Sequence, residues 1–208
     1  MLSPARFNGM LNRMGQNISW SRAHDCPCRD PNSGAARYDC PICGGKGVHW
    51  ESSKTGKAAI AGQKVQENWA KFGQYENGDQ VMSIPSDSIL YEMGQFDRMV
   101  MLNSSAPFSI PLVHDGQDKL YFPVQKIYRV FWIDNTNSIV DGGTPSVADD
   151  GTLAWSTGEP PAGEQYTITG RKHPEYFVFT DLPQDRAHYG GLDLPRRVVA
   201  RLMDNFSR

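Results

Sequence analysis

Apolar residues recur at helical spacing near the start of the chain. A helix over residues 4–18 places five apolar side chains on one face, namely Phe7, Met10, Leu11, Met14 and Ile18. Gly9 and Gly15 weaken this helix, because glycine loses more backbone freedom than other residues when it becomes helical. We expect the apolar face to pack against the rest of the domain or against a neighbouring subunit.

From residue 57 onward the pattern changes to short apolar runs bounded by glycine and proline. Runs with apolar residues at successive positions are typical of strands that are buried on both sides, as in a small barrel. The sequence predicts strands at 58–66, 78–85, 88–94, 97–102, 107–113 and 120–133. The first of these is weak, and Pro85 ends the second because proline cannot donate a ladder hydrogen bond.

The later part of the chain alternates between turns and strands. Residues 134–163 are rich in Asp, Gly and Pro and predict a turn-rich insertion with a short strand at 152–155. Two strands with β-branched and aromatic residues are predicted after it, at 165–170 and 175–180. The tail predicts a short helix over about 194–206 that begins near Pro195, with Leu194, Val198 and Leu202 on one face.

The predicted fold class is therefore mainly β: a small β-barrel core, a zinc-ribbon-like N-terminal loop, a β-rich insertion and short helices at both ends. We expect residues 1–50 to form the N-terminal helix and metal loop, and residues 51–208 to form the barrel-like domain. The composition agrees, since 20 Gly and 14 Pro suit many short strands joined by turns. With 39% hydrophobic and 21% charged residues the chain is typical of a soluble globular protein.

The 4 cysteines are confined to one short segment, as Cys26-Pro27-Cys28 and Cys40-Pro41-Ile42-Cys43. Four thiolates are a complete ligand set for a tetrahedral structural zinc, and such a site has no open position for a substrate. The second pair is followed by Gly44 and Gly45, which allow the backbone to fold its N–H groups toward the sulfur atoms. The sequence thus predicts a structural zinc held by Cys26, Cys28, Cys40 and Cys43.

Three alternatives to this ligand set remain open, namely His24 as a ligand, two disulfides, and free thiols without a metal. The first pair of cysteines has only one residue between them, and His24, just upstream, is an alternative fourth ligand. Two disulfides would use the same cysteines, but they require an oxidising compartment. The first ten residues contain no apolar segment of the kind found in signal peptides, so zinc is favoured.

Candidate catalytic residues do not cluster in the sequence. His49, His114, His173 and His188 show no spacing that suggests a shared site. The segment from Gly44 to Gly47 lacks the spacing and the Ser or Thr of a phosphate-binding loop. We therefore expect a protein that is not an enzyme. The apolar runs are too short to span a membrane, and the net charge of −2 gives no general attraction for nucleic acid.

Three stretches together carry a resemblance to a known family. They are the cysteine loop within 20–47, the pair 78–85 and 97–100, and the late segments 151–166, 173–176 and 194–197. Taken as a set, they resemble small neck proteins of tailed bacteriophages, which serve as head–tail connector, head-closure or collar components beneath the portal. The likeness covers most of the chain as a pattern of short motifs.

The resemblance implies a structural subunit of a homo-oligomeric ring, a hexamer or dodecamer, in the virion neck. Its partners would be copies of itself, the portal and the adjacent neck and tail proteins, with double-stranded DNA passing through transiently and no membrane. It would be made in the cytoplasm of the bacterial host. The alternative is a nucleic-acid-binding zinc-ribbon protein, supported by the cysteine loop and by Arg196, Arg197 and Arg201.

A DNA channel sets its own requirement on the loops that line it. Lys and Arg hold phosphates, so a wall that lets DNA slide should carry acidic or neutral turns instead. Three turns of this kind are candidates for the channel wall: 74–79, 114–118 and 146–150.

Overall fold

The computed structural model describes residues 3–61, 68, 71, 76, 78–182 and 188–205. The chain forms two compact units. Unit 1 combines the two ends of the chain, Met1–Asn103 and Glu175–Arg208, and unit 2 is the intervening segment Ser104–Pro174. No helix among the described residues is both long enough and apolar enough to cross a membrane.

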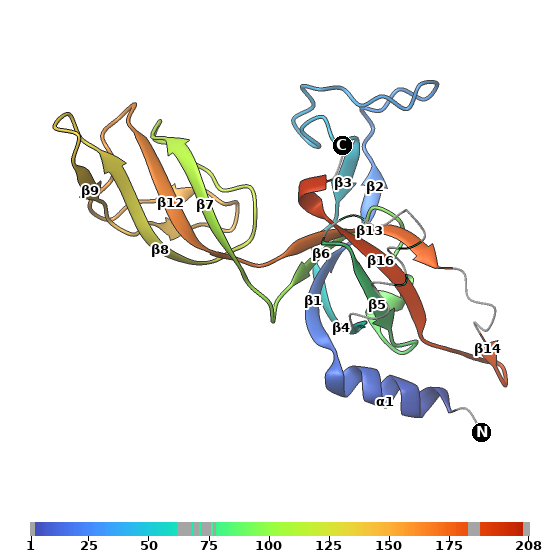
Figure 1. Cartoon of the computed structure of the whole chain (residues 1–208). Helices are drawn as coiled ribbons and strands as arrows, with labels where there is room; N and C mark the ends of the chain where they lie inside the picture. The colour runs from blue at the N-terminus through green and yellow to red at the C-terminus, as the bar shows by residue number, and fades with distance from the viewer. Residues whose placement is uncertain are drawn as a thin grey trace. The chain divides into compact units, whose positions relative to one another are not determined.

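Unit 1 is built on a closed barrel in which every neighbouring pair of strands is antiparallel (Figure 1). The strands, in the order in which they pair, are β1 (Gln16–Ser21), β4 (Lys54–Ile60), β5 (Gln80–Ile84), β16 (Arg196–Leu202), β13 (Glu175–Leu182) and β6 (Arg98–Met101). Pairing of β6 with β1 closes the barrel. The expectation of a mainly β chain with a small barrel is confirmed.

Alternation along the strands fills the barrel. Residues two apart point to the same side of a strand, so each barrel strand contributes side chains at every second position. The resulting core contains Ile18 and Trp20, Met82 and Ile84, Met99 and Met101, Tyr176 and Val178, and Val198 and Ala200. Methionine is frequent because its unbranched, flexible side chain fills irregular space inside a narrow barrel.

The N-terminal helix α1 (Pro4–Met14) is shorter than predicted. Ile18 does not continue its apolar face but lies in β1, where it is fully buried. The change occurs at Gly15, where an added Cβ would lie 2.6 Å from the Leu11 carbonyl oxygen and 3.1 Å from that of Ala58. Only glycine allows the chain to pass this close to both the helix and β4.

Two of the predicted strands, at 88–94 and 58–66, differ from the elements in the structure. The segment 88–94 is not a strand: it contains the 3-10 helix η1 (Ile89–Glu92), which begins where the Ser88 hydroxyl accepts a hydrogen bond from the Leu90 N–H. Leu90 is completely buried in the barrel core, which explains why the segment looked apolar. The weak strand predicted at 58–66 is described only in part. Residues 58–60 belong to β4, and residues 62–66 lie outside the described residues.

The predicted C-terminal helix over 194–206 is wrong. This segment forms β16, followed by the short 3-10 helix η2 (Met203–Asn205), and residue 206 lies outside the described part. β16 pairs with β5 on one side and β13 on the other, so the barrel is closed only when it is a strand. The spacing of Val198 and Leu202 fits a helix and a strand equally well, and these long-range pairings decide between them.

Unit 2 is a four-stranded antiparallel sheet with a small hairpin (Figure 1). The sheet order is β7 (Ala106–Val113), β12 (Gln165–Lys172), β8 (Val124–Ile133) and β9 (Ile139–Asp141), and the hairpin consists of β10 (Ser146–Val147) and β11 (Leu153–Ala154). The inserted unit extends well beyond the predicted insertion at 134–163, because strands on both sides of that segment belong to the same sheet. Residue 50 is not a unit boundary, since β1 and β4 are neighbours in one barrel.

Two small hairpins project from unit 1. β2 (Ala23–Asp25) pairs with β3 (Val48–Trp50), and the cysteine segment lies between them. β14 (His188–Tyr189) pairs with β15 (Leu192–Asp193) just before β16.

Candidate metal centre

The hairpin β2–β3 brings the two ends of the cysteine segment together. Cys26 follows β2 directly, and its N–H donates to the Gly47 carbonyl oxygen at 2.9 Å, which extends the ladder by one step toward the sulfur cluster. Cys43 lies five residues before Val48, the first residue of β3. A hairpin of three-residue strands is marginally stable by itself, so the loop it carries needs further stabilisation.

The second cysteine pair adopts the tight turn that its glycines predict. Gly44 and Gly45 have φ values of 56° and 82°, in the left-handed region that favours glycine. The Gly44 N–H donates to the Cys40 carbonyl oxygen at 2.9 Å, and the Gly47 N–H donates to the Cys43 sulfur at 3.3 Å. Backbone donors of this kind stabilise a thiolate that is bound to a metal.

All four sulfur atoms lie within 4.8 Å of one another. Cys26 Sγ is 3.7 Å from Cys40 Sγ, and Cys28 Sγ is 3.5 Å from Cys43 Sγ. The four cysteines are free thiols, not disulfides. A tetrahedral ion with metal–sulfur bonds of about 2.3 Å separates its ligands by roughly 3.8 Å, so a single metal ion fits this cluster. Three of the four cysteines are buried, and Cys28 is partly exposed.

Backbone hydrogen bonds favour the thiolate form of Cys40 in particular. N–H groups of Cys43 and Ile42 donate to the Cys40 sulfur and lower the pKa of that thiol to about 6. At Cys28 the backbone N–H of Arg37 also lowers the pKa, but burial and the neighbouring sulfur atoms outweigh it and raise the pKa to about 12. A metal ion would bind these cysteines as thiolates, and the backbone donors at Cys40 would favour that form of its sulfur.

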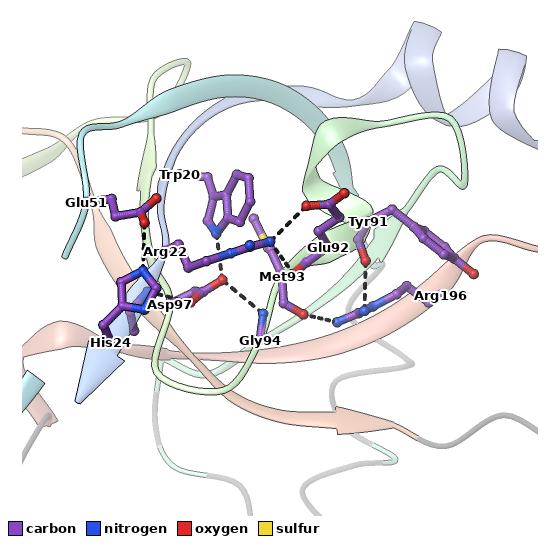
Figure 2. Close-up of polar contacts among 11 residues, drawn as sticks. Trp20, Arg22, His24, Glu51, Tyr91, Glu92, Met93, Gly94, Asp97 and Arg196 are labelled. Carbon is purple, nitrogen blue, oxygen red and sulfur yellow. Dashed lines mark hydrogen bonds and ion pairs between the residues drawn. The ribbon is translucent and has the colours of Figure 1, made fainter. Parts of the chain in front are cut away.

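His24 is not a member of the sulfur cluster. Its Nε2 lies 2.7 Å from Glu51 Oε1, across the hairpin, and the ring is about half exposed (Figure 2). Glu51 has its pKa lowered, first by the hydrogen bond from His24. The alternative in which His24 replaces a cysteine ligand therefore receives no support from the geometry, because its polar nitrogen is directed to a carboxylate.

A buried carboxylate attaches the β2–β3 hairpin, called the metal hairpin from here on, to the barrel. Asp97, which is 2% exposed, accepts hydrogen bonds from the Trp20 indole N–H at 2.7 Å, the Ala23 backbone N–H at 2.7 Å and the Gly94 backbone N–H at 2.9 Å (Figure 2). These donors come from β1, β2 and the turn before β6. Sequence reasoning missed this residue, because its partners at Trp20 and Ala23 lie more than seventy positions away along the chain.

Unit 2 contains a separate buried polar cluster around Asp118. Its Oδ2 lies 2.6 Å from His114 Nδ1 and accepts a hydrogen bond from the Tyr166 hydroxyl at 2.9 Å, and its Oδ1 accepts from the Asp115 N–H at 3.0 Å. Burial would raise the pKa of the Asp118 carboxyl, but these hydrogen bonds outweigh burial and lower it below the ordinary 3.8. The i, i+4 spacing of His114 and Asp118 was the only sequence signal for this cluster.

Acid is expected to loosen the turn at Asp118. Because its folded pKa is depressed, the stability it contributes is fully present above the ordinary pKa of 3.8 and is lost as the pH falls through the lower folded value. Tyr166→Phe removes one bond to the carboxylate and should cost unit 2 about 1.5–3 kcal/mol at pH 7. Urea unfolding of unit 2 amides followed by NMR at pH 7 and pH 3 tests this. If the unfolding free energy of unit 2 falls equally between pH 7 and pH 3 in the variant and in the parent protein, this prediction is contradicted.

The other histidines do not join a common site within the described residues. His49 lies opposite His24 in the metal hairpin and is exposed. His173 Nδ1 lies 3.0 Å from the Ser104 carbonyl oxygen, and His188 Nδ1 lies 2.7 Å from Asp193 Oδ1. Each contact is local to a strand end or a hairpin.

Comparisons with known proteins add no family. The scan against protein-family models found no match to this chain, and the search of curated proteins found none either. The functional argument therefore depends on the two units themselves. Their clearest chemical feature is the group of four cysteines, which can hold a metal ion.

Proposed function

We propose that this protein is a structural subunit of a ring in the neck of a tailed phage virion, where it joins the head portal to the tail and forms part of the DNA channel. The metal in this proposal is zinc, in a purely structural role. Four thiolates around one position are the set that zinc prefers, and a site filled by four protein ligands leaves no place for a substrate.

The observation that carries the proposal is an exposed apolar surface on each unit. On α1, Phe7, Met10 and Met14 are 39%, 49% and 72% exposed, at positions that share one side of the helix. A stripe of this kind on a regular element is typical of a protein–protein contact. We infer that α1 lies against another subunit in the assembled protein.

The sheet of unit 2 carries the second surface. Val113 in β7, Ile133 in β8 and Ile139 in β9 are 57%, 58% and 61% exposed. Ile133 is paired with Ile139 across the β8–β9 hairpin, so these two side chains lie on the same face of the sheet. Two such surfaces on different units of one chain favour contacts between unlike faces of identical subunits, and such contacts form a ring where the rotation between neighbouring subunits closes.

The barrel suits a ring subunit for a further reason. Its strands pair all the way round, so it presents no free sheet edge to promote disordered aggregation. Association through the barrel is then left to its side-chain surfaces, which can specify one geometry. The proposed partners are copies of the same chain in a hexamer or dodecamer, together with the portal and the adjacent neck and tail proteins.

Some residues of the three candidate channel turns are buried or lie outside the described residues, which shortens the list of side chains that can face DNA. Of the turn 74–79, residues 74, 75 and 77 lie outside the described residues, and Asp79 is buried. In the turn 114–118, Asp118 is buried against His114 and Tyr166, so it cannot face DNA. The acidic side chains that remain available for a phosphate-repelling wall are the exposed Glu76, Asp115, Asp149 and Asp150.

The test is the mass and shape of the purified protein. Native mass spectrometry and negative-stain imaging are expected to show a closed ring, and antibody against the protein is expected to label the neck of the virion. Met10→Glu or Ile139→Glu places a charge in a proposed contact and should weaken association at least about tenfold, which is about 1.4 kcal/mol. Gln125→Glu, at an exposed polar position of β8, is the control and should leave the ring intact.

Two results would contradict the proposal. One is a monomer at all concentrations, with Met10→Glu and Ile139→Glu behaving like the parent protein. The other is salt-sensitive binding to DNA by a protein that forms no ring, which would favour the nucleic-acid-binding alternative.

A further inference from the structure

Positive charge flanks the exposed apolar stripe of α1. Arg6 and Arg13 lie seven positions apart, which places them on the same side of the helix, and both are exposed. The other side of α1 faces the barrel unit, where the Asn8 amide donates to the Ser86 hydroxyl at 2.9 Å and accepts from the Ser86 N–H at 3.1 Å. The helix contains no Asp or Glu, and neither arginine has an ion-pair partner among the described residues. The free side of α1 is therefore apolar with uncompensated positive charge beside it.

The sheet of unit 2 has one covered face and one open face. On the covered face, Tyr166 and Ile168 of β12 pack with Leu153 of the β10–β11 hairpin. Side chains alternate along a strand, so Val113 and Ile133, each one position beyond a residue packed on this core, belong to the open face. β7 ends at Val113 and β8 ends at Ile133, so the exposed apolar side chains gather at one end of the sheet (Figure 1).

This end of the sheet is acidic. Segments 131–141 and 159–165, which form most of it, contain no Lys or Arg. One of their carboxylates, Asp141, is already paired with the arginine at the middle of β8. Three further carboxylates lie at least partly exposed in these segments, namely Asp134, Glu159 and Glu164. The open face thus carries apolar side chains with uncompensated negative charge beside them, the complement of α1.

We propose that α1 of one subunit docks on this end of the unit 2 sheet in a neighbouring copy of the same chain. Burial of the two apolar surfaces stabilises the contact, and the arginines of α1 approach the carboxylates around the sheet end. Like surfaces repel each other, because two α1 helices are both positive and two sheet ends are both negative. The contact is therefore heterologous, and it repeats from subunit to subunit. This inference rests on the proposed function, since it names the two faces that meet in the ring.

Two charge-reversed variants test the pairing. The helix variant carries Arg6→Glu and Arg13→Glu, and the sheet variant carries Glu159→Lys and Glu164→Lys. Each variant alone should associate at least about tenfold more weakly than the parent protein at low salt, measured by analytical ultracentrifugation. An equimolar mixture of the two should recover most of the lost association. In alternating order, each reversed helix meets a reversed sheet, and each parent helix meets a parent sheet.

Surface positions were chosen so that the fold is retained, and the thermal midpoints of both variants check this. Neither glutamate makes a side-chain hydrogen bond or ion pair with another described residue. Should a reversed variant unfold, the neutral changes Arg13→Gln and Glu164→Gln replace it, and each should weaken association and lower its salt dependence. Arg197→Glu, at an exposed position of β16, is the control and should associate like the parent protein.

The pairing is overturned if the mixture of folded variants associates no better than either variant alone, or if the neutral changes leave association and its salt dependence unaltered. Both results leave the ring proposal standing when the parent protein forms a ring. A parent protein that stays monomeric removes the ring and the pairing together. In that case, binding to DNA or to vesicles of anionic lipid that is lost in the helix variant would show that α1 serves a different partner.

Discussion

Cys43→Ser is expected to abolish metal binding and to unfold the segment between β1 and β4 without unfolding the barrel. Cys43 is buried, and its sulfur accepts a hydrogen bond from the Gly47 N–H. Serine replaces this sulfur, so the metal loses one ligand and the Gly47 N–H loses its acceptor. Structural zinc sites contribute about 10–16 kcal/mol of apparent binding free energy at pH 7. The segment has no apolar core of its own, since the only buried cluster in it consists of the cysteines.

Metal analysis and hydrogen exchange measure this result. We expect one equivalent of zinc in the parent protein, less than about half an equivalent in Cys43→Ser, and fast exchange of the amides at residues 26–47 in the variant. His24→Gln is the matched control: it alters the neighbouring histidine, which bonds Glu51, and should retain full zinc content. Iron instead of zinc, or disulfides in the purified protein, would show that the proposed metal is wrong.

Asp79→Ala is expected to be the most destabilising single change in the barrel. Asp79 is 0% exposed, and the guanidinium of Arg201 donates to both of its carboxylate oxygens, with Nε at 3.2 Å from Oδ1 and Nη2 at 3.0 Å from Oδ2. Arg201, in β16, is itself 11% exposed and stacks over the Phe179 ring at 3.7 Å. Removing one member of a buried pair costs about 3–5 kcal/mol. Glu76, which lies 3.3 Å from the Arg201 guanidinium but is 53% exposed, compensates the remaining charge only in part.

The thermal midpoint of unit 1 should fall by roughly 6–20 °C in this variant. Asp141→Ala is the matched control, because it breaks an aspartate–arginine pair with Arg129 in which the side chains are 63% and 51% exposed. Water screens that pair, so its loss should have a much smaller effect. Both variants are compared by thermal unfolding with metal present. Similar midpoints for the two variants would mean that the buried pair is not a major contributor to the barrel.

The sequence predicted the features that depend on local pattern. Apolar runs located β5, β6, β13 and part of β4, and the confined cysteines located the cysteine cluster, whereas β1 and β16 were not predicted as strands. The predictions that were wrong concern segments whose structure depends on contacts between positions far apart in the sequence. Val198 and Leu202 fit either a helix or a strand, and only the edges offered by β5 and β13 select the strand. Leu90 made its segment look like a strand, although a single buried side chain on a 3-10 turn fills the same space.

The buried carboxylates could not be found from spacing. Asp79 lies 122 residues before its partner Arg201, and Asp97 lies 77 residues after Trp20. Each of these residues appears in the sequence as an ordinary turn aspartate beside glycine or a strand start. Their roles follow from the closure of the barrel, because closure brings together segments of unit 1 that are far apart in the sequence.

The insertion point of unit 2 has a consequence for how this protein can evolve. The segment leaves unit 1 after β6 and returns at β13, and these two strands are hydrogen-bonded neighbours, with Val100 opposite Glu175. At the base of unit 2 the chain is paired again, with Ala106 opposite Lys172. A lineage could therefore exchange, enlarge or discard this module by recombination at a single hairpin, and the register of every other barrel strand would be inherited unchanged.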